Sequence, residues 1–320
     1  QQSATIASLY NKVAALTGGA SINATATPLD KTLDAVAKDL VAAKGKSLVV
    51  SGSNDAAEQV VVNAINNLLT NYGATINLDR ACNLRSSNDA AVTEFMTDMN
   101  SGSVGAVIFW NTNPAYSMPD GKAFKAALDK VGVKISFADR EDETAQYCDY
   151  ICPDHHYLES WGDAQPYTGV YSLQQPTIRP LFNTRQAAES IMKWAGATQA
   201  DYYTYVRDFW AANIYSMQTG VSSFEAFWTK SLRDGVFETA TTAGAASWTG
   251  DLNAAAAQLA KPATGSEVVL YEKAGMGNGA YANNPWLQEL HDPISKVCWD
   301  NYFAVLPSYA EKMGWRQGTV

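Results

Sequence analysis

The residues whose types and spacing could do chemistry are concentrated in one stretch, CDYICPDHHYLESWGDA at 148–164. Five of its carboxylate and imidazole side chains fall within ten residues: Asp154, His155, His156, Glu159 and Asp163. Oxygen and imidazole ligands together can hold a metal ion. Adjacent histidines usually point in different directions, and polar contacts that order a strand-end loop explain the same residues. We therefore predict no metal site here, and take Asp154, His155 and Glu159 as candidate ligand contacts.

A second group of acidic residues follows the apolar run VKISFAD. Asp139 closes that run and Glu143 comes four residues later. In nucleotide-binding folds, an acidic residue at a strand end accepts hydrogen bonds from a ribose or a guanine. Asp139 or Asp142 could instead cap the short helix expected for DETAQYC, with acidic residues at its positive end. Both interpretations remain open for Asp139 and Glu143.

The third candidate loop lies in VGAVIFWNTNPAYSMPDGKAF at 104–124, where a buried strand leads into an Asn-Pro turn and then a helix. In an open α/β sheet, ligands bind in the crevice outside the carboxyl ends of the strands. Asn111, Asn113 and Pro114 therefore belong to a binding loop or to the remains of one.

The familiar signatures of catalysis are absent from the chain. It contains no GxSxG, HExxH or GxGxxG sequence. Its four cysteines are scattered, without the close spacing that iron-sulfur clusters and structural zinc sites use: Cys82, Cys148, Cys152 and Cys298. We predict no catalytic residue and no iron in this chain, and its status as an enzyme stays uncertain.

Composition excludes two classes of partner. The formal net charge is −9 and the 23 Lys and Arg residues are dispersed, so no basic surface for nucleic acid is expected. No run of about eighteen apolar residues is present for insertion into a bilayer. Only 17% of the residues are charged, which favours a chain that packs against other subunits. Because the chain starts at Gln1, we take it as a processed or excised piece of a longer polypeptide.

The elements that must position these loops alternate along the chain. Amphipathic helices are expected over about 29–44, 54–73, 88–99 and 120–131, and short β-branched strands in SLVVSG, ATINLDR, VGAVIFW, VKISFAD and DYICPD. Strands that alternate with helices indicate a parallel sheet. The prediction is an α/β fold of Rossmann-like, doubly wound type, with a mostly parallel sheet and helices on both faces.

Four regions are expected. Residues 1–45 form a helical lead-in, and residues 46–196 form the Rossmann-like domain. Residues 197–262 are aromatic-rich helices followed by an Ala/Thr/Gly-rich linker; the aromatic residues have helical spacing and are expected in a core or interface. Residues 263–320 open with a strand and a Gly/Asn/Pro-rich loop, and are expected to be the start of a further domain.

Three segments in this order resemble the third domain of the molybdopterin oxidoreductase family, the dimethyl-sulfoxide-reductase-like enzymes: NTNPAYSMPD, FADREDETAQYCDYICPDHHYLESWGD and GVYSLQQPTIRPLFNTRQAAESIMKWAG. Cofactor-bearing members hold the guanosine end of a molybdopterin guanine dinucleotide in this domain. The resemblance implies cofactor-contacting or vestigial roles for the matching positions: Asn111, Asn113, Pro114, Asp139, Glu143, Asp154, His155 and Glu159. Thr112 departs from the family, whose dinucleotide-binding members often have glycine there, where the backbone must approach the ligand.

The closing stretch ANNPWLQELHDPISKVCWDNY resembles the iron-sulfur subunit of bacterial alternative complex III. In that subunit a domain that has lost its molybdopterin cofactor is joined to a cluster-bearing domain. The resemblance implies a scaffold without a cofactor of its own, at the periplasmic side of the inner membrane, within a complex that passes electrons from quinol to an acceptor through other subunits or domains.

Two alternatives remain open. The chain could be the guanine-dinucleotide-binding part of an active molybdenum or tungsten oxidoreductase, in which the protein positions the cofactor. It could also be a small-molecule binding module of Rossmann type unrelated to either. Guanine dinucleotide or molybdenum in the parent protein distinguishes the scaffold from the active enzyme.

Overall fold

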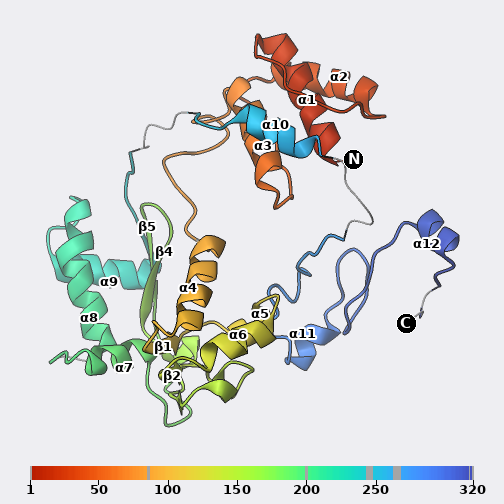
Figure 1. Ribbon diagram of the computed structural model, residues 1–320. Coiled ribbons are helices and arrows are strands. Elements are labelled where there is room, and N and C mark those ends of the chain that lie inside the picture. Colours follow the sequence, from red (N-terminus) through yellow and green to blue (C-terminus); the bar gives the residue numbers. More distant parts are fainter. Residues whose placement is uncertain are drawn as a thin grey trace.

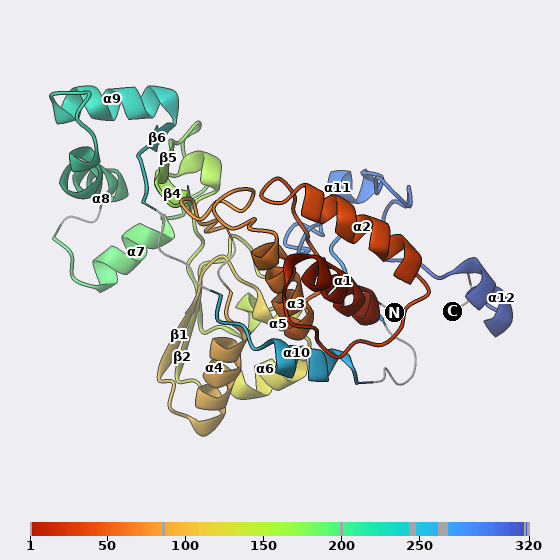
Figure 2. The ribbon, with the colours of Figure 1, turned by 90° about the horizontal axis from the view of Figure 1, so that it is seen from above.

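The computed structural model describes residues 2–84, 87–198, 201–242, 248–261, 268–316 and 318 (Figures 1 and 2). Its helices are α1 Gln2–Thr17, α2 Asp30–Ala42, α3 Ala56–Leu68, α4 Asp89–Ser101, α5 Pro114–Ser117, α6 Gly121–Leu128, α7 Ala187–Trp194, α8 Tyr202–Phe209, α9 Phe224–Asp234, α10 Leu252–Leu259, α11 Pro285–Glu289 and α12 Pro307–Met313. Its strands are β1 Ala106–Phe109, β2 Val133–Ser136, β3 Tyr150–Ile151, β4 Gly162–Tyr167, β5 Val170–Gln174 and β6 Val236–Glu238.

The first hydrophobic cluster is formed by helices, and it brings α10 together with α1, α2 and α3. Val13 of α1, Ala37 of α2 and Ile65 of α3 are fully buried in it. Ala256 of α10 is buried in the same cluster, and Figure 1 shows α10 lying against α3. A helix therefore occupies part of the segment expected to be a linker; residues 243–247 and 262 of that segment lie outside the described residues.

The strand expected at 47–52 does not form. The side-chain amide of Asn66 on α3 makes the backbone hydrogen bonds that a neighbouring strand would otherwise make. Its Oδ1 accepts from the Val49 N–H at 3.0 Å, and its Nδ2 donates to the Val49 carbonyl at 2.7 Å. The expected strand ATINLDR is reduced to a single bridge between Tyr72 and Ile76. Both strand predictions were wrong: the backbone of Val49 is paired by the Asn66 amide, and the N–H groups of residues 74–76 donate to the Asn71 carbonyl in a turn.

The second cluster is built on a parallel sheet of order β1-β2-β3. Ile108 pairs with Ile135, and Ile135 pairs with Tyr150. Phe109 points to the face that α4 and α6 cover, where its ring meets Phe124 edge to face at 6.0 Å. The helix α6, which lies between β1 and β2 in the sequence, has Asp120 as its N-cap.

The opposite face of the sheet receives α7. Side chains alternate along a strand, so Phe137 points away from the side of Ser136 and Phe109. Its ring stacks on Trp194 of α7 with centroids 5.5 Å apart. With helices on both sides of a parallel sheet, the molecule has the α/β, Rossmann-like fold that the sequence predicts. The short helix expected in DETAQYC is a 3₁₀ turn at Ala145–Tyr147.

A second sheet, antiparallel and of order β4-β5-β6, was not anticipated from the sequence. Its hairpin turns at Thr168 and Gly169 between β4 and β5. Gly169 has φ +79°, and a Cβ there would lie 2.9 Å from the Thr239 carbonyl oxygen. Two residues ending in glycine between two short runs are a recognised hairpin signal.

The third cluster consists of aromatic side chains from α8, α9 and the strands beside them. Trp210, in the π-helical turn that follows α8, is fully buried against Phe227 and Trp228 of α9. Its indole N–H donates to Asp163 on β4 at 2.9 Å. The helices expected in this region form, and Trp210, Phe227 and Trp228 are in a core as expected, whereas Tyr205 and Phe209 are exposed.

Residues 268–316 form turns and the short helices α11 and α12; in Figure 1, α11 lies near α5, whereas α12 lies apart from the rest of the chain. The expected strand SEVVLY lies partly outside the described residues, and its described part, 268–271, has no strand pairing. No helix within the described ranges is both long and apolar enough to cross a membrane.

Candidate functional site

A cleft of about 1270 Å³ opens at the carboxyl edge of the parallel sheet. Its walls come from the loops that follow β1, β2 and β3, from β4, and from residues 278–283 of the C-terminal region. This is the location where open α/β sheets bind ligands. The three polar loops singled out in the sequence therefore meet at one place.

In the loop after β1, the Asn113 side chain is fully engaged. Its Nδ2 donates to Glu143 Oε2 at 2.7 Å, and its Oδ1 accepts from the Thr144 hydroxyl at 2.7 Å. Pro114 begins α5 and has no N–H. The N–H of the next residue, Ala115, donates to Thr144 Oγ1 at 3.0 Å. The start of α5 therefore offers no unpaired donor to a ligand.

Asn111 lies at the tip of the same loop and lines the cleft with φ +53°. This left-handed conformation is tolerated by asparagine because its short polar side chain can bond locally. Thr112 follows it and also lines the cleft.

In the loop after β2, the Asp142 carboxylate caps the 3₁₀ turn. Its Oδ1 accepts from the N–H groups of Thr144 at 3.0 Å and Ala145 at 2.7 Å. The capping interpretation is therefore correct for Asp142. The Asn113 amide, followed by the Glu143 backbone N–H, lowers the pKa of the Glu143 carboxyl. Asp139 lines the cleft and accepts from its neighbour Arg140 at 2.9 Å.

In the loop after β3, Asp154 is the best-bonded carboxylate of the cleft. Its Oδ1 accepts from the N–H groups of His155 and Ala187, each at 2.7 Å. Its Oδ2 accepts from the Trp110 indole N–H at 3.0 Å. Ala187 is the first residue of α7, so a carboxylate of the protein itself occupies the anion position at that helix N-terminus.

The neighbouring residues divide between the cleft and the loop frame. His155 and His156 both line the cleft, and His156 Nδ1 also accepts from the Leu158 N–H at 3.2 Å. The Glu159 carboxylate links two loop segments, because it accepts from the Leu181 N–H at 2.9 Å and from the His156 N–H at 3.1 Å. The Leu181 N–H and then the His156 N–H lower the pKa of Glu159.

The structure brings together most of the site residues that the sequence predicts. The cleft is lined by Asn111, Asn113, Asp139, Glu143, Asp154 and His155. Pro114 and Glu159 do not line it, and they shape α5 and the third loop instead. The sequence analysis missed Trp161, Tyr202 and residues 278–283. The Gly/Asn-rich composition of 275–284 was the available signal for the last segment, and its partner could not be read from it. The ligand-contacting roles remain predictions.

The cleft is acidic. The carboxylates among its described lining residues are Asp139, Glu141, Asp142, Glu143, Asp154 and Asp163, and they face one guanidinium, Arg140. Within the described ranges, no group of three or more His, Cys, Asp and Glu side chains is placed to hold a metal ion. Charges of one sign in a concave site repel an anionic ligand.

The fold and the cleft define an α/β protein of Rossmann-like type with a ligand-site geometry at its sheet edge, and comparison with known proteins narrows the relationship. No protein-family profile matches the chain. Over 100 residues, it is 38% identical to the "Menaquinone reductase, molybdopterin-binding-like subunit" of Nitratidesulfovibrio vulgaris. The match covers 30% of this chain and 14% of that protein. This similarity supports a molybdopterin-oxidoreductase-like relationship.

Proposed function

We propose that this chain is a molybdopterin-oxidoreductase-like domain that serves as a scaffold, without a cofactor of its own, in a membrane-associated respiratory complex. The complex passes electrons from quinol to an acceptor through clusters and haems held elsewhere, on the periplasmic side of the inner membrane. The finer assignment is the iron-sulfur subunit of alternative complex III. The name of the Nitratidesulfovibrio relative, a molybdopterin-binding-like subunit of menaquinone reductase, supports the respiratory role.

The observation that carries this proposal is that the protein fills its own anion positions. A dinucleotide needs N–H donors for its pyrophosphate, and helix N-termini supply them. In this cleft Asp154 already accepts from the first residue of α7, and Asp142 accepts from Thr144 and Ala145. Asn113 is bonded at both ends of its amide. The N–H groups of Ala187, Thr144 and Ala145, which could otherwise meet an anion, are therefore engaged by carboxylates of the domain itself.

The charge of the cleft points the same way. Six carboxylates and one guanidinium line it among the described residues. A pyrophosphate would be repelled by this set, since two like charges ~4 Å apart at a protein surface cost on the order of 4 kcal/mol. The residues present do not fit a molybdopterin guanine dinucleotide, so we assign this chain no step through that cofactor.

Exposed apolar side chains support a role in assembly. In the C-terminal region Ile294 is 90% exposed, Phe303 85% and Trp286 82%. Apolar residues exposed in such numbers over one region mark surfaces that other chains or domains cover. A domain retained for its surfaces requires partners at such positions.

A second candidate is the guanine-dinucleotide-binding part of an active molybdenum or tungsten oxidoreductase. The size of the cleft favours it, because about 1270 Å³ exceeds the ~300–1,000 Å³ typical of small-molecule sites. Asp139, near the start of the loop that follows β2, would be the contact for guanine.

The test is made on the full-length parent protein purified from its native host. Molybdenum and tungsten are measured by mass spectrometry, pterin by fluorescence, and GMP after acid release. We expect none of these in stoichiometric amount. A stoichiometric metal together with pterin and GMP would overturn the scaffold proposal and establish the second candidate.

A further inference from the structure

The C-terminal segment 278–283 lies against loops of the parallel sheet that are about 140 residues away in the sequence. It lines the same cleft as the loops after β1 and β2. Figure 1 shows this part of the chain, which leads into α11, beside α5. We refer to residues 278–283 as the strap.

One end of the strap is held by a side-chain hydrogen bond. Arg140 Nη1 donates to Asn283 Oδ1 at 3.0 Å. The same guanidinium is oriented from its other edge, where Nε donates to Asp139 Oδ1 at 2.9 Å. Because two neighbours fix its plane, Arg140 presents a defined donor to the strap.

The middle of the strap requires a glycine. Gly279 has φ +81°, and a Cβ at this position would lie 2.8 Å from Tyr116 Oη and 3.1 Å from Tyr116 Cε1. The left-handed backbone alone disfavours any other residue, and the ring of Tyr116 occupies the space a side chain would need. By contrast, Gly277 has φ +51° with no atom within 4 Å of its Cβ position.

Successive turns of the strap are closed by its own backbone hydrogen bonds. Ala282 N–H donates to the Gly279 carbonyl at 3.0 Å, and Asn284 N–H to the Tyr281 carbonyl at 2.9 Å. Asn284 then caps α11 by accepting from Trp286 N–H at 3.0 Å. A segment with its turns already formed loses little further entropy on docking.

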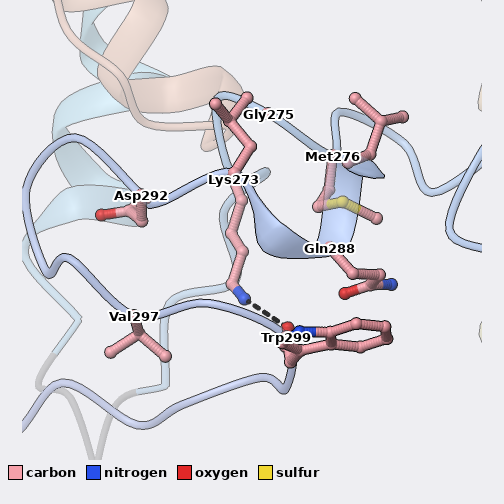
Figure 3. Close-up of a pocket in the computed structure, with 9 residues that line it drawn as sticks. Lys273, Gly275, Met276, Gln288, Asp292, Val297 and Trp299 are labelled. Atoms are coloured by element: carbon pink, nitrogen blue, oxygen red, sulfur yellow. Dashed lines mark hydrogen bonds between the residues drawn. The ribbon is translucent and has the colours of Figure 1, made fainter. Parts of the chain in front are cut away.

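Lys273 precedes the strap in the sequence and bonds to the backbone of residues 299 and 300. Its Nζ donates to the carbonyls of Trp299 at 3.3 Å and Asp300 at 2.5 Å, and Figure 3 shows the first of these contacts. The cavity drawn there measures about 10 Å³, which is about the space of one water-sized probe.

We infer that the strap is a docked wall of the cleft, latched by Arg140 to Asn283 and seated through Gly279 on Tyr116. The cleft is thus a composite of the sheet-edge loops and a segment from the far end of the chain. Its strap wall presents two carboxamides and a phenol, from Asn278, Asn283 and Tyr281.

The first test uses hydrogen exchange of the full chain, followed on peptides that cover 276–284. Arg140→Ala and Asn283→Ala are each expected to raise exchange of the strap about fivefold. Because they remove the same bond, the double variant is expected to exchange no faster than either single variant. A double-variant effect equal to the product of the two single effects would overturn the latch.

The second test separates the seat on Tyr116 from backbone strain. Gly279→Ala and Gly277→Ala both place a Cβ at positive φ, and only the first meets Tyr116. We expect faster strap exchange in Gly279→Ala than in Gly277→Ala, and partial restoration when Tyr116→Ala is added to Gly279→Ala. Equal exchange in the two alanine variants, or wild-type exchange at the rate of an unstructured peptide, would overturn the proposal.

Discussion

The Asp154 carboxylate is expected to hold the start of α7. It accepts from His155 N–H, Ala187 N–H and the Trp110 indole. Of these bonds, the one from Ala187 holds α7; a hydrogen bond to a charged acceptor contributes about 1.5–3 kcal/mol, and a negative charge at a helix N-terminus adds about 0.5 kcal/mol. Asp154→Ala should therefore cost about 3 kcal/mol of local stability.

The conservative variant makes the prediction more specific. In Asp154→Asn the amide oxygen can keep the bonds from His155 and Ala187, because both go to the same oxygen, Oδ1. The amide nitrogen would face the Trp110 donor, and the negative charge at α7 would be gone. We expect Asp154→Asn to cost about 1 kcal/mol.

The assay is hydrogen exchange of peptides covering α7, Ala187–Trp194. Since about 1.4 kcal/mol corresponds to a tenfold change in an equilibrium, protection should fall about a hundredfold in Asp154→Ala and about fivefold in Asp154→Asn. Trp110→Phe is the matched control, because it removes the indole donor and keeps a ring beside Phe137.

A particular result would refute the reasoning. If Asp154→Ala left the protection of α7 within twofold of the wild type, the carboxylate would not be holding the helix. The α7 N-terminus would then be open to a ligand phosphate, and the argument against a bound dinucleotide would lose its main support.

Three further predictions concern other parts of the molecule. The hydrogen bond from Asn113 lowers the pKa of Glu143, so ionised Glu143 stabilises the fold above its ordinary pKa of 4.5, and this contribution is lost as pH falls through the lower folded pKa. Asn113→Ala should bring the pKa of Glu143 back toward 4.5 in an NMR titration, and an unchanged pKa would contradict the assigned cause. Burial, then Asp142 and Asp149, raises the pKa of Cys148 to about 11, so at pH 8 iodoacetamide should label the exposed Cys82 well before Cys148, as followed by peptide mass spectrometry; equal rates would contradict this. Trp210→Phe should lose the bond to Asp163 and cost about 1–2 kcal/mol, against about 3–5 kcal/mol for Trp210→Ala, measured by urea unfolding; equal costs would show that the hydrogen bond dominates over packing.

The sequence by itself determined the local parts of this protein. Helical spacing located α2, α3, α4 and α6, and N-cap residues such as Asp55 and Asp120 mark helix starts in the structure. The alternation of helix and strand predicted the Rossmann-like class, and the ends of the apolar runs placed the polar loops at one sheet edge. These features follow from periodicity and capping, which depend on residues only a few positions apart.

Only the tertiary structure decided which partner each polar group takes. Asn66 bonds Val49 and removes a strand, Asp154 caps a helix 33 residues onward, and Arg140 reaches Asn283 across 143 residues. An apolar pattern records whether a side chain is buried, and it carries no record of the distant group that the side chain meets. Which N–H groups Asp142 and Asp154 accept from was therefore decided by packing in three dimensions.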